Sequence, residues 1–298
     1  MATRFPVQAL RSVALIVPDL PRAAKFYTDI WGLVPVSEDA GTLYLRGIGD
    51  DPYVLALTQG PQAGIKQVTW RADPATDLEH LRASMIAAGA QAEQGIAPQK
   101  DPGGGIGFSV LDHAGRRIAV VQGDTRPVPL ANDDWRPVRL AHVNINSASI
   151  DTDIAFYRDG MGMVQTDFNG TMAFLRTNDD HHALVLAKAE INTLNHVSFL
   201  HDHYDHMMRA GGKMCDAGFA IGWGPGRHGP GDNVFFYFVD PFGIVIEHTA
   251  EVLLVDDSYP VGGPKDWIWP EGRVDKWGIC PPKTAECKAA QLAIPFVR

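Results

Sequence analysis

The sequence has few cysteines and no excess of basic residues. Its three cysteines, Cys215, Cys280 and Cys287, are an odd and sparse set without metal-ligand spacing, which is typical of reduced thiols in a cytoplasmic protein. Lys and Arg number 26 against 35 Asp and Glu, so the formal net charge is −9. Because no basic patch is available to meet a phosphate backbone, we expect no nucleic-acid partner.

Long hydrophobic runs are also missing. No stretch approaches the roughly 18 apolar residues that a membrane span requires. The first 20 residues, MATRFPVQALRSVALIVPDL, lack a charged head followed by a long apolar stretch and a cleavage site. We therefore expect a cytoplasmic chain without a membrane partner.

What is present is a globular composition arranged as an internal repeat. With 298 residues and 45% apolar residues, the chain suits two domains of about 100–150 residues each. The segment that starts at Val13 resembles the one that starts at His142, and Phe26-Tyr27 recurs 130 residues later as Phe156-Tyr157. Further anchors at nearly the same offset pair Tyr53 with His182, Gln67 with His196, and Ala119 with Glu247. The chain therefore contains two copies of one fold.

Each copy divides again into two units of strand, helix and three strands. The third unit has the strand LAHVNIN, a helix over about 151–160, and strands near 172–176 and 183–187. The fourth has the strand LNHVSFL, a helix over about 202–210 and a hairpin. We predict an α+β protein with four βαβββ units. Its parts are an N-terminal domain (1–125), a linker (126–137), a C-terminal domain (138–250) and an irregular tail (251–298).

Two histidines open strands on their polar faces. Side chains alternate along a strand, so His142 shares a face with Asn144 and Asn146, opposite Val143. By the same alternation, the side chain of His196 lies on the polar face of its strand. Either histidine alone is compatible with a purely structural role.

Glu247 is an unexpected carboxylate in an apolar hairpin, NVFFYFVDPFGIVIEHT. A type I turn at Asp240-Pro-Phe-Gly243, with Gly243 in the left-handed conformation, pairs residue 240 with 244 and Tyr237 with Glu247. A carboxylate buried in such surroundings needs a positive partner, which a metal ion supplies. At the equivalent positions the first copy has Ser12, Gln67 and Ala119, so the fold does not require ligands there. These observations predict a metal site made by His142, His196 and Glu247 in the C-terminal copy.

Over residues 10–250 the sequence resembles the two-domain extradiol ring-cleavage dioxygenases of the vicinal oxygen chelate superfamily. The resemblance implies glyoxalase-type domains and the metal ligands His142, His196 and Glu247. It places the catalytic histidine at His182 in NDDHHALVLA. It also matches Gly226-Arg227-His228, with Tyr237 nine residues later and Glu247 ten beyond that. It further implies that Asn144, His228 and Tyr237 contact the substrate.

The resemblance also implies a reaction. Two imidazoles and one carboxylate form the facial triad of Fe(II) oxygenases, and Mn(II) suits the same ligands. The expected partners are an aromatic diol of the catechol type and O2, and we expect a homo-oligomer. His182 is the expected acid–base residue, because the pKa of histidine lies near neutrality. His228 and Tyr237 are expected to hydrogen-bond the phenolic oxygens and to handle the proton released on binding.

Two other functions remain open at this stage. One is a glyoxalase-like lyase or isomerase of the same superfamily, which usually needs a fourth protein ligand and often takes ligands from both copies. The other is a protein that binds a small aromatic molecule or an antibiotic without chemistry. The histidine-rich segment FLHDHYDHMM, with His201, His203 and His206, is interpreted as the solvated start of a helix rather than as a metal site.

Overall fold

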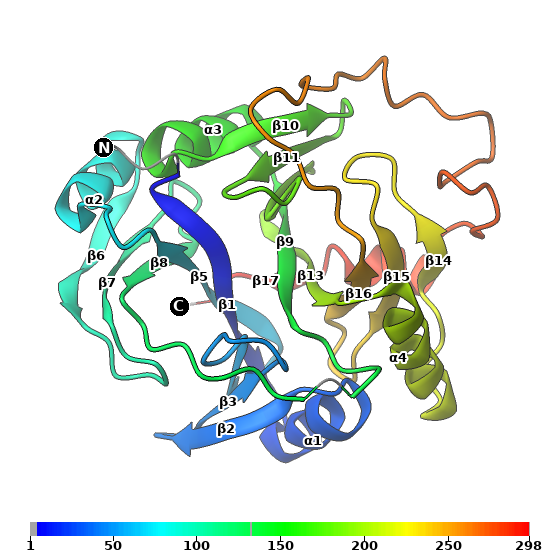
Figure 1. Ribbon diagram of the computed structural model, residues 1–298, viewed down its shortest axis with the longest axis horizontal. Helices are drawn as coiled ribbons and strands as arrows, with labels where there is room; N and C mark the ends of the chain where they lie inside the picture. Colours follow the sequence, from blue (N-terminus) through cyan, green and yellow to red (C-terminus); the bar gives the residue numbers. More distant parts are fainter. Residues whose placement is uncertain (1–4, 132, 298) are drawn as a thin grey trace.

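The computed structural model describes residues 5–131 and 133–297. Its strands form two sheets of eight and nine strands, built from successive parts of the chain (Figure 1). In each sheet the order strand, helix and three strands occurs twice. The predicted α+β class with four βαβββ units is therefore confirmed.

The first sheet and its helices comprise the elements β1 (Val7–Val17), α1 (Leu20–Lys25), the π-helical turn η1 (Phe26–Ile30), β2 (Val34–Asp39), β3 (Thr42–Arg46), β4 (Leu55–Gln59), β5 (Gly64–Ala72), α2 (Leu78–Ala87), β6 (Gln91–Pro98), β7 (Ile106–Leu111) and β8 (Arg117–Gln122). The second sheet and its helices comprise β9 (Arg139–Ser147), α3 (Ile150–Ala155), the π-helical turn η2 (Phe156–Gly160), β10 (Val164–Phe168), β11 (Met172–Arg176), β12 (Leu184–Lys188), β13 (Thr193–His201), α4 (Tyr204–Asp216), β14 (Trp223–Arg227), β15 (Val234–Val239) and β16 (Val245–Ala250). The remaining elements are α5 (Ala285–Ala290) and β17 (Ile294–Pro295).

The strand order is the same in both sheets. It runs β2-β3-β4-β1-β5-β8-β7-β6 in the first and β10-β11-β12-β9-β13-β16-β15-β14 in the second. Ala119 pairs with Thr69 in the first sheet, and Glu247 pairs with Ser198 in the second. These matching registers confirm the repeat and the equivalence of positions 119 and 247.

The helix predicted near 202–210 is longer than expected, since α4 spans Tyr204–Asp216. Two consecutive glycines, 211 and 212, follow the predicted end, and glycine lowers helix propensity. In the structure, a Cβ at Gly211 would lie 2.3 Å from the ring of Phe236. Glycine is therefore needed there for close packing, and Met207, Ala210 and Met214 extend the buried face of the helix across it.

The two halves share one hydrophobic core and touch through specific polar contacts. Buried residues of both sheets belong to the same cluster. The hydroxyl of Tyr27 donates a hydrogen bond of 2.9 Å to the buried carboxylate of Asp240. The indole of Trp31 stacks on the imidazole of His248, with ring centroids 3.6 Å apart. These contacts hold the second sheet at a fixed position against the first.

The chain after β16 returns to the second sheet. Figure 1 shows this segment, coloured orange to red, passing around β10, β11 and β14 before it reaches the region of β13. There β17 pairs with β13, where Thr193 lies opposite Pro295. The three cysteines all lie in described segments and are unpaired. In the described part of the chain, no helix combines the length and apolar character that crossing a membrane would require.

Candidate metal centre

Three neighbouring strands, β9, β13 and β16, place His142, Ser198 and Glu247 in one row across the second sheet. Ser198 lies opposite His142 on one side and Glu247 on the other. Residues that pair directly share a face of the sheet, and His196 shares it too because it precedes Ser198 by two positions. The small side chain of Ser198 leaves space above it into which the three longer side chains converge.

The three predicted ligands meet at short and nearly equal distances. Nε2 of His142 lies 3.0 Å from Nε2 of His196 and 3.1 Å from Oε2 of Glu247. Nε2 of His196 lies 3.2 Å from the same carboxylate oxygen. All three side chains are buried, with exposed fractions of 2%, 3% and 0%. The three ligand atoms therefore form a compact triangle inside the protein, as the alternation and the hairpin register predicted.

The triangle fits a divalent metal ion with three protein ligands on one face. Ligand bonds of about 2.1 Å at right angles separate the ligand atoms by about 3.0 Å, whereas a tetrahedral arrangement separates them by about 3.4 Å. The observed edges of 3.0–3.2 Å lie nearer the octahedral value. Neither carboxylate oxygen of Glu247 accepts a well-formed hydrogen bond within the described residues. A fully buried carboxylate of this kind needs a cation, so the residues fit the ion.

A hydrogen-bond chain from the tail orients His196. Nδ1 of His196 lies 2.8 Å from Oδ1 of Asn195, which also accepts a hydrogen bond of 2.7 Å from Nε2 of Gln291. The amide nitrogen of Asn195 donates in turn to Oδ1 of Asn146. Because the Asn195 oxygen can only accept, the proton of the imidazole is on Nδ1 and the lone pair of Nε2 points to the ligand triangle. Burial lowers the pKa of His196 to about 4, so the imidazole is neutral near pH 7.

His182 lies beside this triangle, and its neighbour His181 points away from it. The ring centroid of His182 is 4.5 Å from that of His142, and His182 lines the cavity. His181 is fully buried and its Nε2 lies 2.6 Å from a carboxylate oxygen of Asp167. Nδ1 of His181 lies 3.1 Å from Nδ1 of His182. The structure thus separates the two members of the His-His pair and places the predicted one in the site.

The Asp167–His181 pair restrains His182. When Nε2 of His181 donates its proton to the carboxylate of Asp167, Nδ1 of His181 can accept a hydrogen bond from Nδ1 of His182. Burial, followed by the neighbouring His142 and His181, lowers the pKa of His182 well below its ordinary value. A neutral His182 with its proton on Nδ1 has a free lone pair on Nε2. This nitrogen is therefore able to accept a proton.

His228 and Tyr237 form a hydrogen-bonded pair on the other side of the ligands. Nε2 of His228 lies 3.1 Å from the hydroxyl of Tyr237 and 3.6 Å from Oε1 of Glu247. The ring of His228 stacks on that of Phe235, with centroids 3.9 Å apart. Burial lowers the pKa of His228, and burial followed by the charge of Glu247 raises the pKa of Tyr237 well above its ordinary value. Near pH 7 the imidazole is a proton acceptor and the phenol is a proton donor.

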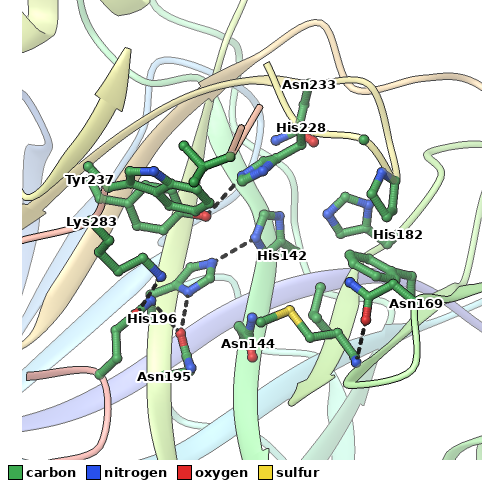
Figure 2. Close-up of a pocket in the computed structure, with 18 of the residues that line it drawn as sticks. His142, Asn144, Asn169, His182, Asn195, His196, His228, Asn233, Tyr237 and Lys283 are labelled. Atoms are coloured by element: carbon green, nitrogen blue, oxygen red, sulfur yellow. Dashed lines mark hydrogen bonds between the residues drawn. The ribbon is translucent and has the colours of Figure 1, made fainter. Parts of the chain in front are cut away.

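These groups line a cavity of about 200 Å³. Figure 2 shows His142 at its centre, with His182 on one side and His196 and Tyr237 on the other. Asn144 also lines the cavity, and its Oδ1 is buried without a hydrogen-bond partner in the described structure. All the predicted site residues therefore contribute to one place.

The histidine-rich segment at the start of α4 gathers no metal-ligand set. His203 is the residue before the helix, and His206 lies 3.7 Å from Asp134. Nε2 of His201 instead contacts Nδ1 of His248 at 2.8 Å. In the described segments, His142, His196 and Glu247 form the group of three whose ligand atoms lie within 4.8 Å of one another.

Several residues of the site were absent from the sequence-based prediction. The tail contributes Trp269, Lys283 and Gln291 to the cavity wall. The tail also reaches Asp167, whose other carboxylate oxygen accepts a hydrogen bond of 3.2 Å from the indole of Trp267. In the sequence these residues belong to no repeat and no periodic segment. The adjacent histidines at 181 and 182 were the available sign that one of them needs an acidic partner.

Comparison with known proteins agrees with the fold. Residues 139–248 match the family model described as the glyoxalase/bleomycin resistance protein/dioxygenase superfamily. A crystal structure of an Mn(II)-bound glyoxalase from Novosphingobium aromaticivorans is similar, with 32% sequence identity and a TM-score of 0.88. The similarity covers 99% of this chain and 96% of that one.

Two relatives with dioxygenase names are also similar. Metapyrocatechase 2 from Cupriavidus necator is 29% identical over 221 residues, which are 72% of this chain and 60% of the relative. The chain thus matches less than two thirds of that relative's length. The manganese-dependent 2,3-dihydroxybiphenyl 1,2-dioxygenase from Geobacillus genomosp. 3 is 26% identical over 253 residues, covering 77% of this chain and 80% of the relative.

Proposed function

The chain belongs to the glyoxalase/bleomycin resistance protein/dioxygenase superfamily, and from this premise we propose that it is a metal-dependent extradiol dioxygenase that cleaves a catechol-type ring next to its diol. The observation that carries the proposal is the arrangement of the buried triangle beside the cavity. The three ligand atoms would hold one face of an ion, and the adjacent cavity has proton-transfer groups on both sides.

The proposed ligands are His142, His196 and Glu247, with Fe(II) or Mn(II) as the ion. When bound, the ion would supply a Lewis acid for the ionised diol and a route for electrons from the ring to dioxygen. Both imidazoles would bind the ion through Nε2, and Asn195 fixes that orientation for His196. The carboxylate reduces the charge of the dication by one.

The proposed role of His228 and Tyr237 is to bind the diol. The neutral imidazole of His228 accepts the proton that the diol loses on binding, and the phenol of Tyr237 donates a hydrogen bond to the resulting oxygen anion. Their mutual contact of 3.1 Å holds both groups in position before substrate arrives. Asn144 supplies a further acceptor, its free Oδ1.

His182 is proposed as the acid–base residue of the ring-opening steps. Its free Nε2 accepts a proton and later returns it, while His181 and Asp167 hold the ring in one orientation. Gly231 packs directly against this ring, since a Cβ there would lie 2.6 Å from Cε1 of His182. His182 is therefore restrained on both sides.

An isomerase activity of the glyoxalase type is the second candidate, because the relative from Novosphingobium aromaticivorans carries that name. The equivalent positions of the first sheet do not provide metal ligands, whereas glyoxalase-type enzymes often take ligands from both halves. Gln67 there donates a hydrogen bond of 2.8 Å to Thr69, and Ala119 has no ligand atom. No fourth histidine, cysteine or carboxylate completes the ligand set within the described residues.

The test is oxygen consumption by protein loaded with Fe(II), and separately with Mn(II), in the presence of a panel of catechols. The proposal requires oxygen uptake together with a yellow ring-fission product, and the metal-free protein serves as control. Isomerisation of a glutathione thiohemiacetal without oxygen uptake would replace the proposal with the glyoxalase activity. Binding of catechols without either reaction would assign a binding role.

A further inference from the structure

One cationic side chain lines the cavity. Lys283 is the only lysine or arginine among the described residues of its wall, and no aspartate or glutamate side chain is part of that wall. The residue lies in the tail just before α5 and is half-buried. Figure 2 shows it between Tyr237 and His196, on the side of His142 opposite to His182. The tail therefore brings a positive charge into a site formed by the second sheet.

The ammonium group of Lys283 is held in place but has no ionic partner. It donates a hydrogen bond of 2.6 Å to Oε1 of Gln291. It lies 4.4 Å from the ring centroid of Trp223 and 5.6 Å from that of Tyr237. Within the described part of the chain, no carboxylate forms a salt bridge with it. An ammonium group has three protons to donate, so at least one direction of bonding remains free toward the cavity.

This arrangement costs free energy in the absence of a ligand. Partial removal of an ammonium from water is unfavourable unless an anion accompanies it. The burial lowers the pKa of Lys283, and Glu247 and Cys287 partly oppose this effect. The ammonium is also close enough to contribute to the lowered pKa of His196, which burial mainly causes. The charge of Lys283 therefore interacts with two of the candidate metal ligands, Glu247 and His196.

The charges of the proposed complex leave Lys283 unmatched. A divalent metal, the carboxylate of Glu247 and a singly ionised catechol sum to zero. The ammonium then remains as one uncompensated positive charge beside the substrate. An unsubstituted or alkyl-substituted catechol would leave the charge of the ammonium uncompensated. A catechol whose ring carries a carboxylate would neutralise that charge.

The size of the cavity limits the substrate further. Its volume of about 200 Å³ compares with about 150 Å³ for a protein cavity that holds benzene. One aromatic ring with a small substituent fits within this volume. The apolar side chains of Met172, Phe174 and Val185 supply a surface against which a single ring packs.

Resting on the function proposed above, we propose that the substrate is a single-ring catechol with an anionic substituent, such as a carboxylate, and that Lys283 is the residue that selects for this charge. Gln291 acts as a positioning residue, since its side chain binds both the ammonium of Lys283 and the amide oxygen of Asn195. The same glutamine thus links the substituent subsite to the ligand His196.

Binding without turnover tests this proposal. Mn(II)-loaded protein under nitrogen is titrated with 3,4-dihydroxybenzoate and with its neutral amide, and binding is followed by tryptophan fluorescence, to which Trp223 beside Lys283 contributes. Metal-free protein is titrated in parallel with benzoate and benzamide, which cannot chelate an ion. The variants are Lys283→Met and Lys283→Arg. The matched control is Lys288→Met, which removes an exposed lysine from α5.

The wild type and Lys288→Met should bind each carboxylate about 10- to 100-fold more tightly than its amide, as one charge-assisted hydrogen bond provides. Lys283→Met should lose this preference, and Lys283→Arg should retain part of it. Equal binding of acid and amide by the wild type would overturn the proposal. An unchanged preference in Lys283→Met, or an equal loss for acid and amide, would also overturn it. Oxygen uptake is measured separately. If the protein prefers the carboxylates but consumes no oxygen, the dioxygenase function is refuted and the role of Lys283 in binding remains.

Discussion

Replacement of Glu247 by glutamine tests the candidate metal centre most directly. The carboxylate is fully buried and its Oε2 lies 3.1 and 3.2 Å from the two imidazole nitrogens. Glutamine has the same shape, so packing is preserved while the only anionic ligand is lost. Since loss of a mere supporting contact weakens metal binding about 10- to 100-fold, we expect at least a 100-fold weaker affinity for Glu247→Gln.

The magnitude follows from binding linkage. A metal at 100 times its dissociation constant stabilises the folded state by about 2.7 kcal/mol, which raises the melting temperature of a protein of this size by about 4 °C. After a 100-fold loss of affinity, the same metal concentration contributes about 0.4 kcal/mol and a shift of about 1 °C. The melting temperature is measured by circular dichroism during titration with Mn(II), together with the metal content of the dialysed protein.

The control for this experiment is Glu190→Gln, which removes an exposed carboxylate elsewhere on the second half of the chain. It should show the full wild-type response to metal. If Glu247→Gln also showed that full response, the ion would bind elsewhere and the assignment of the centre would be wrong. If neither the wild type nor the control responded, the buried triangle would not hold an ion.

Four further predictions concern the surroundings of the centre. His182→Ala should keep the metal content and lower kcat by about 100- to 10,000-fold, as loss of an acid–base residue does; a wild-type kcat for ring cleavage would disprove its role. Gly231→Ala should also lower kcat at unchanged metal content, because the new Cβ would lie 2.6 Å from the His182 ring; steady-state kinetics at several catechol concentrations separate this effect from one on KM. Asn195→Ala should raise the metal dissociation constant about 10- to 100-fold, since it frees the ligand imidazole to rotate; isothermal titration calorimetry measures it. Burial raises the pKa of Asp240 from 3.8 to about 6. The contribution of Asp240 to the free energy of unfolding is therefore complete below pH 4 and falls by about 3 kcal/mol as the pH rises above 6. Denaturant unfolding of Asp240→Asn should lack this part of the pH dependence, and an unchanged profile would contradict the assignment.

Local patterns predicted much of the fold and the ligand triangle. Strand alternation is a local property, so it placed His142 and His196 on polar faces before any tertiary contact was known. Turn chemistry is equally local, and the Asp-Pro-Phe-Gly turn fixed the pairing of Tyr237 with Glu247 that the structure contains. The repeat then supplied the relation between distant strands that local patterns lack.

The tail could not be placed in the same way. Lys283 and Gln291 reach the cavity because β17 pairs with β13, a contact between segments about 100 residues apart. That pairing has only two residues on the β17 side, and among the described residues no equivalent segment follows the first sheet. The direction of His181 was also not readable, since two adjacent histidines before a strand differ only in which one meets Asp167.

The two sheets show why one half of the protein needs an ion and the other does not. In the first sheet, Gln67 satisfies its amide by bonding to Thr69, and Ala119 leaves no charge to compensate. In the second, the equivalent pair His196 and Glu247 places a carboxylate at zero exposure among groups that cannot all be satisfied by hydrogen bonds. The same backbone register thus gives a self-contained core in one copy and an incomplete polar cluster in the other. An ion held by these three side chains would compensate the buried carboxylate, so stability and chemistry at this site would depend on the same residues.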